Sequence, residues 1–92
     1  MKLFKNIDEK FEDIGFKKVK EDKYGVVYER YDEKYKYKQV LDILHKASGK
    51  HIIQSYDGTN TASELFLPMV GLTGYEMKLA LKKMKKLKLY SK

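Results

Sequence analysis

Two histidines, His45 and His51, are the residues of this chain best suited to metal binding or proton transfer. They flank Ala47-Ser48-Gly49, a short turn between two β-rich runs. A three-residue turn with its glycine in the left-handed region would set His45 directly opposite His51 on neighbouring strands. A metal needs a third ligand, and the chain has no cysteine and no third histidine. The two histidines are therefore weak metal candidates, and we expect no metal and no cofactor.

The same histidines, beside nearby lysines, are also the pattern that comes closest to a catalytic site. Small RNA-cleaving toxins need little more than a histidine or tyrosine next to basic residues. The chain contains no glycine-rich phosphate loop, no nucleophile elbow and no HExxH pattern. The sequence assigns no catalytic residue and favours a non-enzymatic protein, with a toxin-like RNA-cleaving enzyme as the weaker alternative.

The net charge of +7 is concentrated near the C-terminus. Residues 75–92 contain seven lysines and one glutamate, whereas residues 1–74 contain thirteen basic and twelve acidic residues. Lysines interrupted by aromatic and aliphatic groups suit phosphate contacts combined with stacking. The candidate nucleic-acid or partner-binding residues are Lys78, Lys82, Lys83, Lys85, Lys86, Tyr75 and Leu79. The alternatives are a solvated helix with lysines that serve solubility, or burial of Leu79 under the segment 57–72.

A β-hairpin over residues 35–56 is predicted to organise the fold around these candidates. Its sequence, YKYKQVLDILHKASGKHIIQSY, alternates between a more apolar odd face and a more polar even face. The even face nevertheless carries four apolar or aromatic residues, Val40, Leu44, Ile52 and Tyr56. If no other segment covers them, they form an exposed patch that suits a protein partner or a homodimer contact.

Helices are predicted at both ends of the chain. Asn6 begins a capping box, and Gly15 is a suitable left-handed stop, after which Phe16 would fold back onto Phe11; this predicts a helix over about 6–14. A second capping box, Thr73 with Glu76, begins a helix that runs to about Leu89. Its predicted buried stripe is Met77, Ala80, Leu81, Met84 and Leu87.

Two further strands, over 16–20 and 24–31, precede the hairpin and complete the fold prediction. The order is α-β-β-β-β-α, an α+β fold with a four-stranded antiparallel meander sheet flanked by an N-terminal and a C-terminal helix. The 92 residues suffice for a single domain, 1–92. The start lacks the apolar core of a signal peptide and no apolar run is long enough to span a membrane, so we expect a soluble cytoplasmic protein without membrane association.

Three stretches resemble a group of short, uncharacterised proteins encoded by phages and prophages of Gram-positive bacteria. They are IGFKKVKEDKYGVVYERYD, QVLDILHKASGKHIIQSYD and GLTGYEMKLALKKMKKL, and together they cover most of the chain. The resemblance implies origin in a bacterial host cell and a small accessory role.

Two functions from different classes follow from these observations. The leading hypothesis is a non-enzymatic phage-type accessory protein that binds nucleic acid or a nucleoprotein through its basic C-terminal helix. The alternative is a protein-binding inhibitor of a host defence or regulatory protein, which would use the even face of the hairpin.

Overall fold

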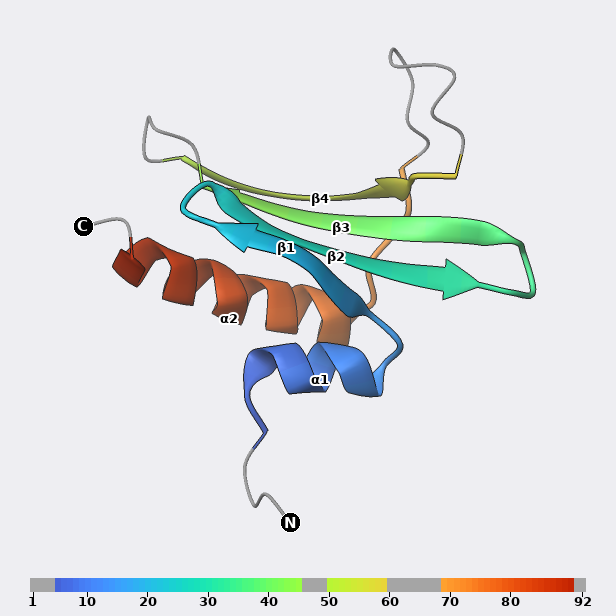
Figure 1. Ribbon diagram of the computed structural model, residues 1–92, viewed down its shortest axis with the longest axis horizontal. Helices are drawn as coiled ribbons and strands as arrows, with labels where there is room; N and C mark the ends of the chain where they lie inside the picture. Colours follow the sequence, from blue (N-terminus) through green and yellow to red (C-terminus); the bar gives the residue numbers. More distant parts are fainter. Residues whose placement is uncertain (1–4, 46–49, 60–68, 91–92) are drawn as a thin grey trace.

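A computed structural model describes residues 5–45, 50–59 and 69–90 and gives the element order α-β-β-β-β-α. The elements are α1 (Ile7–Asp13), β1 (Lys17–Asp22), β2 (Gly25–Asp32), β3 (Tyr37–His45), β4 (His51–Asp57) and α2 (Gly74–Tyr90). The strands form one antiparallel sheet in the order β1-β2-β3-β4, and both helices lie on the same side of it (Figure 1). The predicted α+β meander is confirmed.

The pairing of β3 with β4 has the register predicted from the sequence. His45 lies opposite His51, and Ile43 lies opposite Ile53. The turn that was used to derive this register, within residues 46–49, falls outside the described residues. The pairing itself is confirmed.

The core lies between the sheet and the helices. Residues of β2 and β3 whose side chains point to the same side of the sheet are buried there together with α1, α2 and Phe16. The largest fully buried side chains are Tyr28, Phe11, Phe16, Leu41, Ile43 and Leu79. The opposite side of the sheet is covered by no helix or strand among the described residues (Figure 1).

The ends of α1 follow from local sequence. The Asn6 side chain accepts the Glu9 N–H at 2.8 Å, and the Glu9 carboxylate accepts the Asn6 N–H at 3.4 Å, which completes the predicted capping box. At the other end Gly15 has φ +95° and the Phe16 N–H donates to the Phe11 carbonyl at 3.0 Å. The two phenyl rings then meet edge to face with centres 5.7 Å apart, as predicted.

The buried face of α2 differs from the predicted stripe. Met77 and Leu81 are 39% and 47% exposed, whereas Leu79 is 1% exposed. Ala80 and Leu87 are buried as predicted. At about 100° per residue, the inward face is rotated by roughly 80° from the predicted one. The prediction was wrong because it counted apolar residues alone, and two charged residues also face inward.

The sheet is irregular at both of its edges. The β1–β2 register shifts between Lys18 and Lys20, and Lys18 and Glu21 consequently both pair with residues whose side chains face the helices. At the other edge, the segment after residue 68 runs beside β4. Met69 forms an isolated antiparallel β-bridge with Tyr56, and the Val70 N–H donates to the Ser55 carbonyl at 3.0 Å.

We predict that Gly15→Ala lowers the free energy of unfolding by about 1–2 kcal/mol, because alanine is disfavoured at a positive φ. An added Cβ would also lie 3.1 Å from the Arg30 Cδ atom. Urea unfolding provides the measurement. Gly71→Ala is the matched control, since a Cβ there has no atom within 4 Å, and equal effects of the two substitutions would contradict the prediction.

Candidate nucleic-acid interface

The inward face of α2 contains two charged residues, Glu76 and Lys83, which are 4% and 8% exposed. They are seven residues apart and therefore lie on the same side of the helix, two turns from one another. Burial of a charge is costly unless a partner compensates it. The contacts of these two side chains therefore decide how α2 is oriented.

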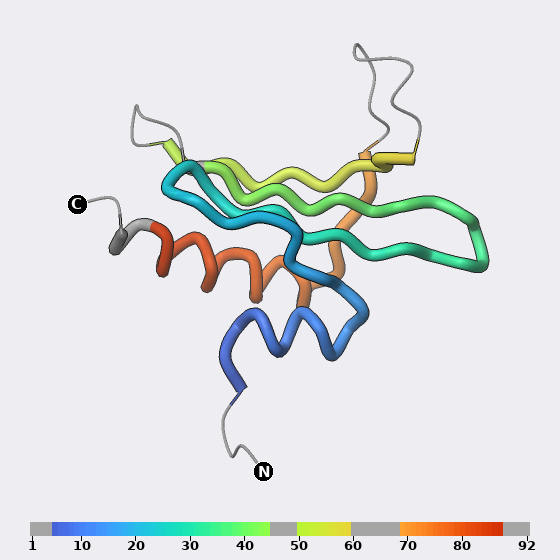
Figure 2. Tube along the Cα trace, in the orientation of Figure 1, coloured from blue at the N-terminus to red at the C-terminus, as the bar shows by residue number. Residues whose placement is uncertain are grey.

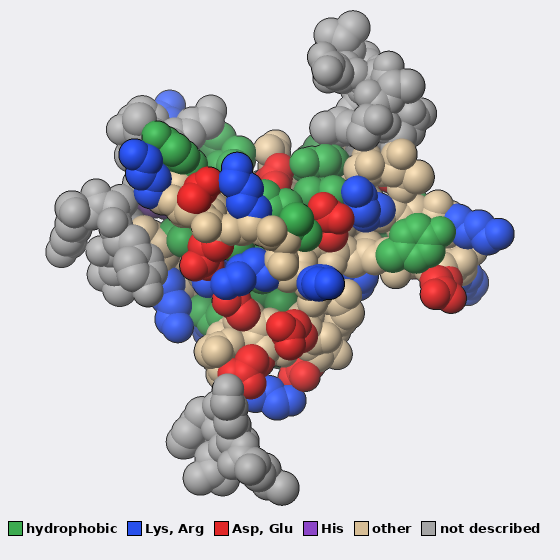
Figure 3. Space-filling view, viewed as in Figure 1, with side chains coloured by type: hydrophobic (Ala, Val, Ile, Leu, Met, Phe, Trp, Pro, Cys, Tyr) green, Lys and Arg blue, Asp and Glu red, His purple; other side chains and the backbone are tan. Residues whose placement is uncertain are grey.

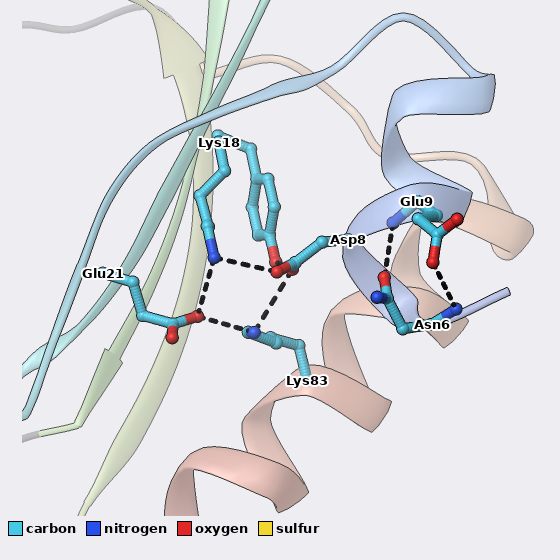
Figure 4. Close-up of polar contacts among 7 residues, drawn as sticks. Asn6, Asp8, Glu9, Lys18, Glu21 and Lys83 are labelled. Carbon is cyan, nitrogen blue, oxygen red and sulfur yellow. Dashed lines mark hydrogen bonds and ion pairs between the residues drawn. The ribbon is translucent and has the colours of Figure 1, made fainter.

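Lys83 belongs to a charge cluster made of Asp8, Lys18, Glu21 and Lys83 (Figure 4). Its Nζ atom lies 3.2 Å from Asp8 Oδ1 and 2.6 Å from Glu21 Oε1. Lys18 contacts the same carboxylates at 2.9 and 3.6 Å. The ammonium groups of Lys18 and Lys83 thus alternate with two carboxylates. The Asp8 carboxylate comes from α1 and the Glu21 carboxylate from β1. The prediction that Lys83 contacts a partner was wrong, because its charge is compensated inside the domain.

Asp8 is the central acceptor of this cluster. Tyr28 donates its hydroxyl hydrogen to Asp8 Oδ1 at 2.5 Å. Burial would raise the pKa of Asp8, but the hydrogen bonds from Tyr28, Lys18 and Lys83 lower this pKa to about 2. Burial and the neighbouring Asp8 carboxylate raise the pKa of Tyr28 far above its ordinary value. Asp8 therefore stays ionised and Tyr28 stays protonated at neutral pH.

Glu76 takes part in a second polar network at the start of α2. One carboxylate oxygen accepts the Thr73 N–H at 2.9 Å, which closes the predicted capping box. The other lies 2.8 Å from Arg30, the single arginine among twenty basic residues. Arg30 also donates to Gln39 at 2.7 Å and to the Ile14 carbonyl at 3.0 Å, so its planar group has three acceptors.

Because both networks turn Glu76 and Lys83 inward, they also determine which residues of α2 face outward. Four exposed lysines lie there, and within the described part of the chain none of them forms an ion pair. We call them the α2 lysines: Lys78, Lys82, Lys85 and Lys86. Tyr75, which is 49% exposed, and the exposed Met77 and Leu81 accompany them.

Leu79 is not part of this outward surface. It is 1% exposed and belongs to the hydrophobic core, so its predicted role in partner binding was wrong. Leu81 and Met77 are the aliphatic side chains that stand beside the lysines. Sequence reasoning placed both in the core because they continued the apolar period.

Charges elsewhere are more evenly balanced. Figure 3 shows acidic and basic side chains intermixed over the face that α1 and β1 form. Lys5 lies 2.6 Å from Asp13, and Lys20 lies 3.4 Å from Asp22. Among the described residues, an excess of one sign of charge is therefore most concentrated on α2.

The predicted patch on the even face of the hairpin is partly covered. Val40 is 6% exposed, and a Cβ added at Gly58 would lie 2.6 Å from its Cγ2 atom, which shows how closely the backbone passes over it. The Tyr56 hydroxyl donates to Asp42 at 3.0 Å, and burial together with this carboxylate raises the pKa of Tyr56 to about 12. Leu44 and Ile52 are half-buried. The four residues therefore do not form a continuous exposed patch, and Gly58, within the segment 57–72, lies against Val40.

His45 and His51 occupy paired positions on β3 and β4, as the predicted register requires. Among the described residues, no group of three histidine, cysteine, aspartate or glutamate side chains lies close enough to hold a metal ion. His51 has an interaction partner within the structure.

Comparison with protein-family models, curated proteins and solved structures finds no significant match. The resemblance to phage-encoded proteins therefore stays a prediction. Neither helix in the described residues combines the length and the apolar character needed to cross a membrane. The function must be inferred from the geometry of the chain itself.

We predict that Lys83→Met lowers the free energy of unfolding by about 2–3 kcal/mol, because it removes the more buried of the two cations that Asp8 and Glu21 share and leaves them with Lys18 alone. The value lies below that for a fully buried pair because solvent reaches both carboxylates. Lys82 is one residue away and exposed, so Lys82→Met should change the free energy of unfolding by less than about 0.5 kcal/mol. Urea unfolding of both variants provides the test, and similar effects would contradict the inward placement of Lys83.

A pH titration tests the role of Asp8. Its pKa falls from 3.8 to about 2 on folding, so its stabilising contribution is complete above about pH 5 and is lost as the pH falls toward 2. We expect Asp8→Asn to lower the free energy of unfolding at pH 6 by about 1–2 kcal/mol relative to the unmodified protein, and the difference to shrink toward pH 2. A difference independent of pH would contradict this assignment.

Proposed function

We propose that this chain is a non-enzymatic accessory protein that binds nucleic acid, or a nucleoprotein, through the outward face of α2. The observation that carries the proposal is the set of α2 lysines, which are exposed and without ion-pair partners in the described part of the chain. Tyr75 and Leu81 beside them offer aromatic and aliphatic contact.

The spacing of the lysines supports contact with a phosphate backbone. Lys78, Lys82 and Lys85 are four and three residues apart, so they follow one side of the helix over about 10 Å. Each lysine that pairs with a phosphate releases a counterion, which makes the affinity fall as the salt concentration rises. A lysine without an internal partner contributes its charge to this binding without first breaking an ion pair.

The acidic residues support the same interpretation. Asp8, Glu21 and Glu76 would repel phosphates if they were free at the surface. Instead their charges are compensated by Lys18, Lys83 and Arg30 on the inner side of α2. A near-neutral interior thus leaves the outward lysines to dominate the field that a polyanion meets.

The protein-binding inhibitor remains the alternative, but no described contact favours it. Val40 is buried, and Tyr56 directs its hydroxyl group to Asp42. Leu44 and Ile52 by themselves form a small apolar area. The resemblance to phage-encoded proteins implies that the proposed activity takes place in the cytoplasm of a bacterial host cell.

We predict that the triple variant Lys78→Gln, Lys82→Gln, Lys85→Gln binds a labelled oligonucleotide at least about tenfold more weakly at low salt. The slope of log affinity against log salt concentration should decrease in magnitude by roughly 2, since each lost phosphate contact removes about 0.7–0.9. Fluorescence anisotropy across a salt series measures both quantities.

The matched control removes three lysines from β1 and its turn, Lys17→Gln, Lys20→Gln and Lys23→Gln. It changes the net charge equally but leaves α2 intact, and we expect less than half of the effect on the slope. If both triple variants weaken binding equally, the interaction reflects net charge and not the α2 surface. If the unmodified protein binds neither single strand nor duplex at low salt, the proposal is refuted.

A further inference from the structure

The hairpin between β2 and β3 projects beyond the rest of the sheet (Figure 2). Its strands pair as far as Asp32 with Tyr37, whereas β1 pairs with β2 only to Glu29 and β4 reaches β3 at Gln39. The residues 31–37 therefore form a two-stranded ribbon and loop without a neighbouring strand on either side. We call this segment the hairpin tip.

The hairpin tip presents tyrosines and lysines together. Tyr31 and Tyr35 are 59% and 69% exposed, the two largest exposed fractions among the tyrosine side chains that the structure describes, so both rings are open to solvent. The Lys34 Nζ atom lies 5.3 Å from the centre of the Tyr35 ring, and Lys36 is exposed in the same loop. An aromatic face beside an ammonium group is thus offered to solvent.

Lys36 has an unusual backbone for a lysine. Its φ is +51°, and it is the one non-glycine residue of the described chain with a positive φ. Glycine or asparagine would adopt this conformation at lower cost. Backbone positions in sparsely populated conformations cluster at functional sites, which makes the Lys36 side chain a candidate for such a role.

We propose that the hairpin tip is a second binding site, which takes the bases and phosphates of a single-stranded nucleic acid. This inference rests on the proposed function for the class of ligand and specifies its form. Tyr31 and Tyr35 stack on bases, while Lys34 and Lys36 contact the adjoining phosphates.

A single strand fits the tip better than a duplex or a protein. In a duplex the bases are already stacked on one another, so exposed tyrosine rings have no base face to contact, whereas a single strand offers one at every nucleotide. Lysines are depleted from the buried centres of protein interfaces, yet here Lys34 lies over the Tyr35 ring and Lys38 pairs with Tyr31 across the strands. Of the two acidic residues at the tip, Asp32 is engaged in the turn, where it accepts the Tyr35 N–H at 3.0 Å.

The experiment compares two exposed tyrosines at opposite ends of β2. Tyr24 is 58% exposed and has Lys23 Nζ 5.1 Å from its ring centre, so it matches Tyr35 in exposure and in its lysine neighbour. Anisotropy titrations use a labelled oligothymidylate of about 20 nucleotides, longer than a typical single-domain site, and a duplex of the same length. The proteins are the unmodified chain, Tyr31→Ser with Tyr35→Ser, Tyr24→Ser, and Lys36→Gly.

The double variant should bind the single strand at least about 5-fold more weakly, with an unchanged salt slope, because stacking and not phosphate contact is lost. Tyr24→Ser should bind like the unmodified protein. Lys36→Gly should also weaken single-strand binding, while its midpoint of thermal unfolding stays the same or rises because the strain is relieved. If Lys36 has only a structural role, Lys36→Gly should instead lower the midpoint of thermal unfolding or leave single-strand binding unchanged.

The outcomes separate this inference from the proposed function. If the double variant and Tyr24→Ser bind the single strand alike, the hairpin tip is not a binding site, whatever the α2 variant does. If the α2 variant binds normally but the double variant does not, the hairpin inference stands and the α2 proposal fails. If the unmodified protein binds neither probe, both are refuted.

Discussion

The orientation of α2 depends on two charges that it turns toward the rest of the domain. Glu76 is held by Arg30 of β2, and Lys83 is held by Asp8 of α1 and Glu21 of β1. Such pairs contribute little net stability compared with apolar packing, but an unpaired buried charge is costly. Any rotation of α2 about its axis would separate both charges from their partners. The two networks therefore act chiefly as specificity devices that select one rotation of the helix.

That single rotation determines the surface of the protein. With Glu76 and Lys83 inward, Leu79 completes the core while Leu81 and Met77 are left in solvent. The α2 lysines are then exposed, and none of them takes part in the described ion-pair networks. The same contacts that orient the helix thus also produce the surface on which the proposed nucleic-acid binding depends. Core structure and candidate function are coupled through two residues of one helix.

The hairpin tip belongs to a different part of the fold, and its exposure has a different cause. The tip extends past the ends of β1 and β4, so no neighbouring strand shields its tyrosines. An aromatic and basic loop at the end of a two-stranded ribbon resembles the surfaces on which proteins stack single-stranded bases. The proposed phosphate contact on α2 and the proposed base contact at the tip would be complementary, because the first would carry affinity without sequence preference and the second would select unpaired strands.

The sequence by itself determined the features that depend on neighbours along the chain. Both capping boxes, the stop at Gly15, the contact of Phe16 with Phe11 and the register of His45 against His51 are set by residues within a few positions of one another. Tertiary structure alone decided which side of α2 faces inward, because the partners of Glu76 and Lys83 come from residues 8, 21 and 30, far away along the chain. A prediction from hydrophobic periodicity places every charged residue on the exposed face. It takes no account of an opposite charge, distant along the chain, that lowers the cost of burial. For that reason Lys83 and Leu79 were misplaced, while Lys78, Lys82, Lys85 and Lys86 were correctly predicted to be exposed.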